Sequence, residues 1–271
     1  MKIVTFLAEK GGVGKTTMAY EFGEYLAKEK QHNVLLVDVD QQLSLSETYG
    51  LVDQQQHSSV NMFRNMDVKI HHMSDKLDLI PGSFLLESLD VELMQQDNHL
   101  HTLNFWLEDF DSLHNWQQYD YIIFDTHPDF KAVNRAVVMA SDVIMMPIEP
   151  ERFGISARTK LENRIALFKE NNRNPLNRSE SLVTAELLFF NNKINKRRIH
   201  SQKLLADTAD DPKVVANVPE REIFKHSIDQ SVSLVDMAHG KLKDPRMTDL
   251  FIQVFGAFDN MQAAIDRTNA S

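Results

Sequence analysis

A glycine-rich segment with two lysines follows the first apolar run of the chain. It reads Glu9-Lys10-Gly11-Gly12-Val13-Gly14-Lys15-Thr16-Thr17. Its second half fits the general phosphate-loop pattern G-x-x-x-x-G-K-[ST], whereas Glu9 stands where the first glycine is usual. Because glycine has no Cβ, its backbone N–H can turn inward and approach an anion closely. The spacing predicts that residues 10–17 bind phosphate, and a glycine-rich turn without a ligand is the alternative.

Two side chains at the end of this loop have chemistry suited to a nucleotide. We expect Lys15 to reach the β- and γ-phosphates and the Thr16 hydroxyl to ligate Mg²⁺, which prefers oxygen ligands. An apolar run over residues 3–7 predicts a buried strand before the loop, and helical spacing predicts a helix over residues 16–30 after it. Phosphate would then lie at the N-terminus of that helix, where free N–H groups favour anions.

Two later apolar runs end in carboxylates. Asp38 and Asp40 close a β-branched run that starts at Asn33. Since side chains alternate along a strand, these two carboxylates lie on one face. Asp125 closes a second run, Tyr121 to Phe124. Solvated acids at strand ends are the alternative, and the phosphate loop makes that alternative the weaker one.

The loop and these carboxylates together resemble the ParA/MinD family of ATPases with a deviant phosphate loop. The family's loop, K-G-G-x-G-K-[ST], is matched by residues 10–16. Its D-x-D-P-Q segment is matched by residues 38–42, with Gln41 in place of proline, and its Y-D-x-I-I-x-D-x-x-P strand by residues 119–128. The chain is most similar to ParA-type plasmid or chromosome partition ATPases that lack an N-terminal helix-turn-helix domain, because the first expected strand begins at residue 3.

The resemblance implies ATP and Mg²⁺ as cofactors and gives roles to the matching residues. Lys10 would cross a homodimer that sandwiches ATP and would contact the phosphates of the partner's nucleotide. Asp40 would position or activate the attacking water. The implied catalytic residues are Lys10, Lys15 and Asp40, and the implied metal-site residues are Thr16, Asp38 and Asp125.

Histidines raise two further questions. His127 stands where the family usually has a small residue or proline, and we expect a loop histidine without a function of its own. The pairs His71-His72 and His99-x-His101 have ligand chemistry. Without acids at ligand spacing on a defined element, however, surface histidines are the favoured interpretation.

The formal net charge of −10 opposes DNA binding by the chain as a whole. DNA affinity depends on cations that replace counterions on phosphates, so their local distribution matters more than the sum. Residues 187–206 contain no carboxylate. They carry five cations, which are Lys193, Lys196, Arg197, Arg198 and Lys203. We expect these to bind DNA, with Arg221 and Lys225 as secondary candidates, and a solvated helix surface is the alternative.

Family membership would imply a partition function. The ATP dimer would hold non-specific DNA and release it after slow hydrolysis stimulated by a ParB-like centromere-binding or adaptor protein. It would work in the cytoplasm, associated with the nucleoid. Either Asn191 or Asn192 would contact adenine. A MinD-like membrane-positioning ATPase and a ParA-like positioner of a protein cargo are the alternatives.

The C-terminal segment bears on the membrane alternative. Residues 247–265 place apolar side chains on one helical stripe, while the polar side is mostly acidic and amide-bearing. Acidic helices are repelled by anionic lipid, so we expect this helix to pack against the sheet and expect no membrane partner.

Composition and periodicity predict the fold class. The 271 residues are 42% hydrophobic, enough for one large core, and contain no cysteine, which excludes disulfides and iron–sulfur ligation. Strands alternate with helices, and continuous apolar runs such as residues 182–190 indicate buried parallel strands. We expect one α/β domain over residues 1–271, a P-loop NTPase with a mostly parallel twisted sheet and helices on both faces. No signal peptide or membrane-spanning run is expected.

Overall fold

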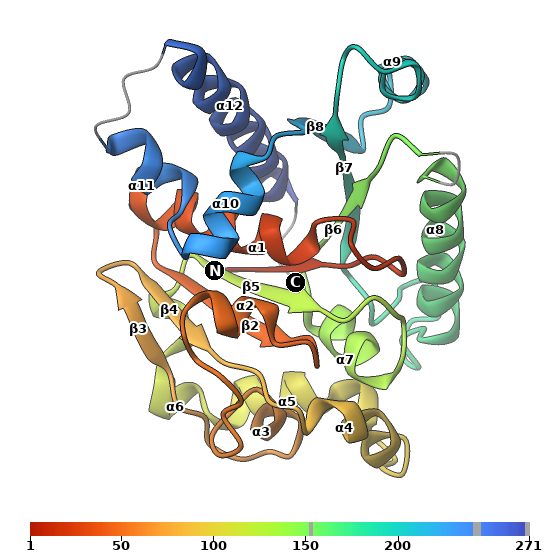
Figure 1. The fold of residues 1–271 in the computed structure, drawn as a ribbon. Helices are drawn as coiled ribbons and strands as arrows, with labels where there is room; N and C mark the ends of the chain where they lie inside the picture. Colours follow the sequence, from red (N-terminus) through yellow and green to blue (C-terminus); the bar gives the residue numbers. More distant parts are fainter. Residues whose placement is uncertain (152–153, 241–244, 269–271) are drawn as a thin grey trace.

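The structure is a computed structural model that describes residues 1–151, 154–240 and 245–268, with side chains throughout except at 245 and 246. Across these ranges the chain forms one eight-stranded sheet with helices packed on both faces (Figure 1). The strands are β1 (Lys2–Phe6), β2 (Val34–Val39), β3 (His71–Ser74), β4 (Leu77–Ile80), β5 (Tyr121–Thr126), β6 (Val143–Ile148), β7 (Glu186–Ile194) and β8 (Val214–Pro219).

Helices connect nearly all of these strands. The longer ones are α1 (Lys15–Glu24), α4 (Leu86–Leu93), α5 (Thr102–Asp109), α7 (Ala132–Ala140), α8 (Gly154–Asn171), α9 (Ile199–Asp207), α10 (Ile223–Gln230) and α12 (Pro245–Arg267). The shorter ones are η1 (Tyr25–Glu29), α2 (Ser44–Thr48), α3 (Val60–Phe63), η2 (His99–His101), α6 (Asp111–His114), η3 (Trp116–Gln118) and α11 (Leu234–His239).

The sheet has the strand order β3-β4-β2-β5-β1-β6-β7-β8, and every neighbouring pair is parallel except β3 with β4. The prediction of a mostly parallel sheet covered by helices is thus confirmed. Because parallel strands end at the same edge, the segments that follow β1, β2, β5, β6, β7 and β8 meet there. Ligands bind at this edge in open α/β sheets, where the strand order reverses.

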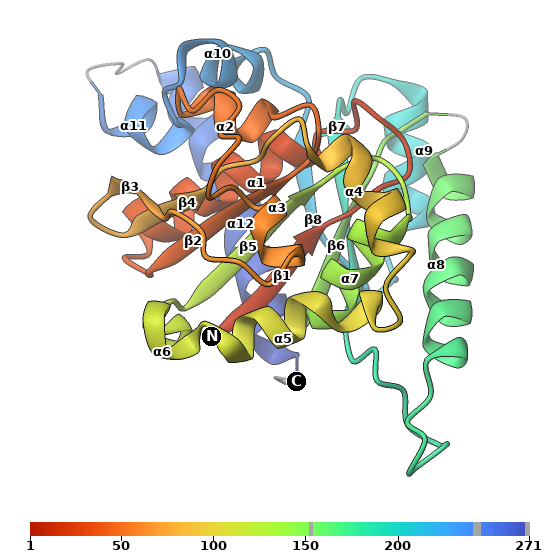
Figure 2. The same ribbon diagram turned by 90° about the horizontal axis from the view of Figure 1, so that it is seen from below.

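Successive strand residues pack on opposite faces of the sheet. On β2, Leu36 packs with α1 and α12, whereas Leu35 packs in the layer formed by α3, α4, α5 and α7. Figures 1 and 2 show these two layers on either side of the sheet. Trp106 and Trp116 are buried in the second layer, with ring centroids 4.8 Å apart, as expected of core residues.

The C-terminal helix α12 packs against the sheet, as its apolar stripe predicts. Val254, Phe258 and Met261 are fully buried there, and the Phe258 ring meets Phe22 of α1 edge-on at 5.7 Å. The two ends of the described chain lie side by side (Figure 2), where Lys2 Nζ donates to the Thr268 carbonyl at 2.5 Å. In the described ranges no helix combines the length and apolar character needed to cross a membrane.

One expectation about an element boundary is wrong. The strand expected over residues 182–190 lies at Glu186–Ile194, four residues later, so its polar end Asn191-Asn192-Lys193 belongs to the strand.

Candidate phosphate-binding site

The glycine-rich segment connects β1 to α1 and turns through two left-handed residues. Gly12 has φ +75° and Gly14 has φ +95°, a region that side chains rarely adopt. A Cβ on Gly14 would lie 2.5 Å from Asn192 Nδ2, so the position also lacks room for a side chain. Gly14 caps α1 without a side-chain hydrogen bond, which leaves the first N–H groups of the helix for an anion.

Asp125 is a buried carboxylate without a hydrogen-bond partner. Neither of its oxygens is satisfied within the described part of the chain, and the side chain is fully buried at the end of β5. Burial and, less strongly, the charge of Asp38 raise its pKa to about 8, although the charge of Lys15 and the Thr16 hydroxyl lower it. Lys15 is itself only 5% exposed. A bare carboxylate between a lysine and the Thr16 hydroxyl is a fitting ligand for a hard cation.

Asp38, the register partner of Asp125, is held by hydrogen bonds instead. Its Oδ2 accepts from the Ser46 N–H at 2.9 Å and from the Ser46 hydroxyl at 2.6 Å, and its Oδ1 accepts from the Asp40 N–H at 3.1 Å. Burial raises its pKa to about 6 even though these three bonds lower it. The structure therefore distinguishes a fixed carboxylate, Asp38, from an unpaired one, Asp125.

Asp40 contacts a histidine whose role the sequence left open. His127 Nδ1 lies 2.8 Å from Asp40 Oδ1, which also accepts from the Gln42 N–H at 2.9 Å. A signal for this contact exists in the register, because Asp38 pairs with Asp125 and the contacting residues each lie two positions further on. Without the strand order this adjacency cannot be inferred, and we expected a histidine without a function.

Lys10 points to acids at the end of β6. Its Nζ lies 2.9 Å from Glu149 and 2.5 Å from Glu151, and hydrogen bonds to Glu151 and Glu149 raise the pKa of Lys10. Glu149 is buried and its other oxygen binds Lys193 Nζ at 2.6 Å. Sequence reasoning missed Glu149, although a carboxylate directly after a buried strand was a usable signal.

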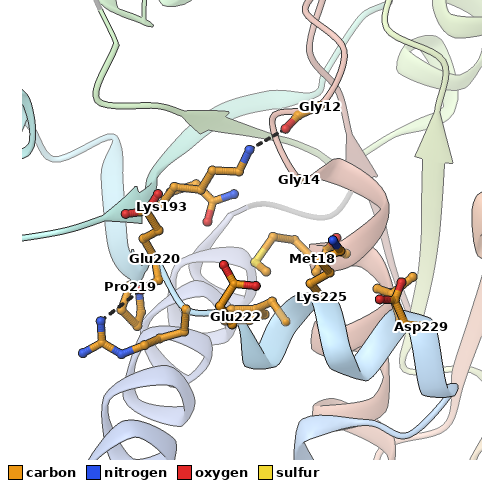
Figure 3. Close-up of a pocket in the computed structure, with 14 residues that line it drawn as sticks. Gly12, Gly14, Met18, Lys193, Pro219, Glu220, Glu222, Lys225 and Asp229 are labelled. Carbon is orange, nitrogen blue, oxygen red and sulfur yellow. Dashed lines mark hydrogen bonds between the residues drawn. The ribbon is translucent and has the colours of Figure 1, made fainter.

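A cavity of about 460 Å³ opens beside the phosphate loop (Figure 3). It lies between Gly14, the end of β7 and the segment from β8 into α10, where Pro219 and Phe224 contribute to its lining. Asn192 lines it and donates to the Val13 carbonyl at 2.8 Å. Asn191 turns away and donates to Thr208 Oγ1 and Asn217 Oδ1, so Asn192 is the better placed of the two for a base.

The five cations expected to form one DNA surface do not lie together. Lys193 lines the cavity beside the phosphate loop and donates to the Gly12 carbonyl at 2.5 Å, because β7 extends through this residue. Lys196 and Arg197 line a separate hollow of about 800 Å³ together with Arg221, and none of the described residues that line it is a carboxylate. The remaining two are Arg198, paired with Glu220 at 3.1 Å, and the exposed Lys203. Lys225, a secondary candidate, also lines the first cavity.

Comparisons with known sequences identify a family and several similar proteins. Residues 1–178 match a family model described as an AAA domain. A virulence plasmid ParA family protein of Chlamydia psittaci is 34% identical over 169 residues, which are 60% of this chain and 62% of that protein. The sporulation initiation inhibitor protein Soj of Bacillus subtilis is 28% identical over 174 residues, 62% of this chain and 66% of Soj. The match thus spans less than two thirds of either relative.

Solved structures share the fold over almost the whole chain. The ATP complex of McdA from Cyanothece superposes with a TM-score of 0.79 at 18% identity, covering 100% of this chain and 98% of that one. A plasmid partition protein of Borrelia burgdorferi bound to AMPPNP gives a TM-score of 0.72 at 18% identity and covers 97% of each chain.

Proposed function

The chain belongs to the AAA domain family and, within it, to the ParA/MinD ATPases, and from this premise we propose that it binds MgATP and hydrolyses it to ADP and phosphate. The observation that carries the proposal is Asp125, a buried carboxylate with both oxygens unpaired, beside Lys15 and Thr16 at the end of the glycine loop. A magnesium ion bound with a nucleotide phosphate would displace the proton that the raised pKa of Asp125 favours, and would give its unpaired oxygens a partner.

The residues present fit Mg²⁺. The Thr16 hydroxyl and Asp125 would hold the ion, and Asp38, fixed by Ser46, would lie behind them. Mg²⁺ usually takes only one or two carboxylates and completes its shell with phosphate and water. When bound, it would neutralise charge on the phosphates.

The other side chains would act on the transferring phosphoryl group mainly through position and charge. Lys15 lies buried at the start of α1 and would contact the β- and γ-phosphates. Asp40 would orient the attacking water, with its carboxylate held by His127 and the Gln42 N–H. Lys10 would serve the partner's ATP in a homodimer, and to do so it must leave Glu149 and Glu151.

The biological role proposed is DNA partition. The ATP dimer would bind non-specific DNA near the nucleoid and release it when a ParB-like partner stimulates hydrolysis. Names of relatives such as plasmid partition protein support this role, as does the hollow lined by Lys196, Arg197 and Arg221. The MinD-like alternative is disfavoured because the apolar stripe of α12 is buried against the sheet rather than available to lipid.

Nucleotide titration and light scattering test this proposal together. Wild type should bind ATP with Mg²⁺ and form a dimer with a non-hydrolysable analogue. Lys15→Ala should lose nucleotide binding. Lys10→Ala should still bind nucleotide as a monomer but should lose most of the dimer. The reason is that Lys10 would contact only the nucleotide bound to the partner subunit. An unchanged dimer fraction in Lys10→Ala would refute the cross-subunit role of this lysine. Absence of ATP binding by the wild type would refute the proposed function.

A further inference from the structure

Lys193 occupies a strained position at an irregularity of β7. Its φ is +55°, in the left-handed region that residues other than glycine seldom adopt. The pairing of β7 with β8 shifts register between Asn191 and Ile194, as at a β-bulge. Such backbone strain persists where the surroundings hold it, and it gathers at functional sites.

The bulge directs two consecutive side chains to the same loop. Asn192 donates to the Val13 carbonyl at 2.8 Å and Lys193 donates to the Gly12 carbonyl at 2.5 Å. In a regular strand, neighbouring side chains would point to opposite faces. Figure 3 shows Lys193 reaching from β7 towards Gly12, with a dashed line for their hydrogen bond.

The lysine also shares an acid with the dimer lysine of the proposed function. Glu149 is 6% exposed and binds Lys193 through one oxygen and Lys10 through the other. The two lysines stabilise the negative charge of Glu149, because a buried carboxylate without a cationic partner would cost free energy. The Lys193 ammonium is thus bound to the phosphate loop and to the segment that follows β6, and its side chain is only partly exposed to solvent.

We propose that Lys193 is a nucleotide-binding residue, not a DNA contact. This assignment rests on the proposed function, because it takes the ligand to be a nucleoside triphosphate. The methylene stem would form a wall of the roughly 460 Å³ cavity and pack on the nucleoside, as lysine stems do on apolar surface. The ammonium would hold the Gly12 turn so that the amides of the loop are preorganised for phosphate.

Nucleotide affinity measured by calorimetry, with DNA binding measured at saturating nucleotide, tests this assignment. Lys193→Met keeps most of the stem and loses the charge. Lys193→Gly loses the whole side chain and relieves the positive φ. Lys160→Met, which removes an exposed lysine on α8, is the matched control. We expect ATP and ADP affinity to fall about tenfold in Lys193→Met and further in Lys193→Gly, and to stay unchanged in Lys160→Met.

Two readouts separate this role from a structural one and from a DNA contact. Lys193→Gly should melt close to wild type, because glycine accepts the left-handed conformation without strain and Lys10 still pairs with Glu149. With nucleotide saturating, both Lys193 variants should bind DNA as wild type does. Wild-type nucleotide affinity with weakened DNA binding would overturn the assignment in favour of a DNA contact. A wild type that binds no nucleotide would overturn the proposed function as well.

Discussion

The two halves of the ligand edge of the sheet are built differently. Around β1, β2 and β5, the loop and the three aspartates stand in short sequence motifs, and adjacent register brings them together. Around β6, β7 and β8, the cavity is lined by residues far apart in the chain, among them Gly14, Lys193 and Phe224. The residues of the proposed phosphate half can therefore be recognised in short stretches of sequence. Those of the proposed nucleoside half, around β6, β7 and β8, are brought together only by tertiary packing.

The halves also differ in how their charges are satisfied. The phosphate half keeps Asp125 buried and unpaired. On the nucleoside side, Glu149 is paired with Lys10 and Lys193, and Glu220 with Arg198. A buried carboxyl group whose oxygens lack partners favours a bound cation, while paired charges hold elements in place. Variants of the aspartates in the first half should accordingly change catalysis, and variants of cavity-lining residues such as Lys193 in the second should change nucleotide affinity.

Asp40→Ala should have the largest effect and so tests this contrast most strongly. Loss of the group that positions water should lower kcat for ATP about a thousand-fold. Nucleotide affinity should remain as in wild type, because the carboxylate does not belong to the nucleoside cavity. Steady-state ATPase kinetics and nucleotide titration measure the two effects. Turnover at the wild-type rate would remove Asp40 from the mechanism.

Glu21 connects α1 of the first half to α10 of the second through hydrogen bonds, and its pKa predicts that stability depends on pH. This α1 residue accepts hydrogen bonds from the Ser227 hydroxyl of α10 and from the Leu234 N–H at 2.9 Å. Burial raises its pKa to about 8, so the folded protein keeps a proton that the unfolded chain releases near pH 4.5. The stability from this group is present below pH 4.5 and is lost as pH rises towards 8.

Glu21→Gln should remove that dependence. Between pH 5 and 7.5, the free energy of unfolding of the wild type should decline more steeply with pH than that of the variant, by up to about 1.4 kcal/mol per pH unit. Urea unfolding at several pH values provides the measurement. Equal slopes in both proteins would show that Glu21 is ionised in the fold, and the account of this link would be wrong.

His127→Ala should produce a smaller change, confined to the phosphate half. Without the Nδ1–H donor, Asp40 keeps only its bond to the Gln42 N–H, and kcat should fall about tenfold, or about 1.4 kcal/mol, at unchanged affinity. His127→Asn should recover most of the activity, since its amide can donate from a similar place. His114→Ala, which breaks the His114–Asp67 pair, is the control. Equal loss in the Ala and Asn variants would contradict a positioning role.

Sequence reasoning predicted the fold correctly and selected residues that adjacent strands bring together in the proposed phosphate half, and the reasons are physical. Glycines with positive φ, a lysine at a helix start and acids after β-branched runs each need their residue type at that position, so the pattern is visible along the chain. The extension of β7 to Ile194 was missed because Asn191, Asn192 and Lys193 are polar, although their side chains are held by tertiary contacts. The contact between His127 and Asp40 needed the strand order.

The central claim, that nucleotide state controls DNA binding, is tested most directly with a long duplex of arbitrary sequence. Binding should be measured with ADP and with a non-hydrolysable ATP analogue across a salt series. The account predicts tight binding only with the analogue and a steep fall with salt, as expected when cations such as Lys196 and Arg197 displace counterions. Absence of DNA binding in both nucleotide states, or equal binding in both, would contradict it.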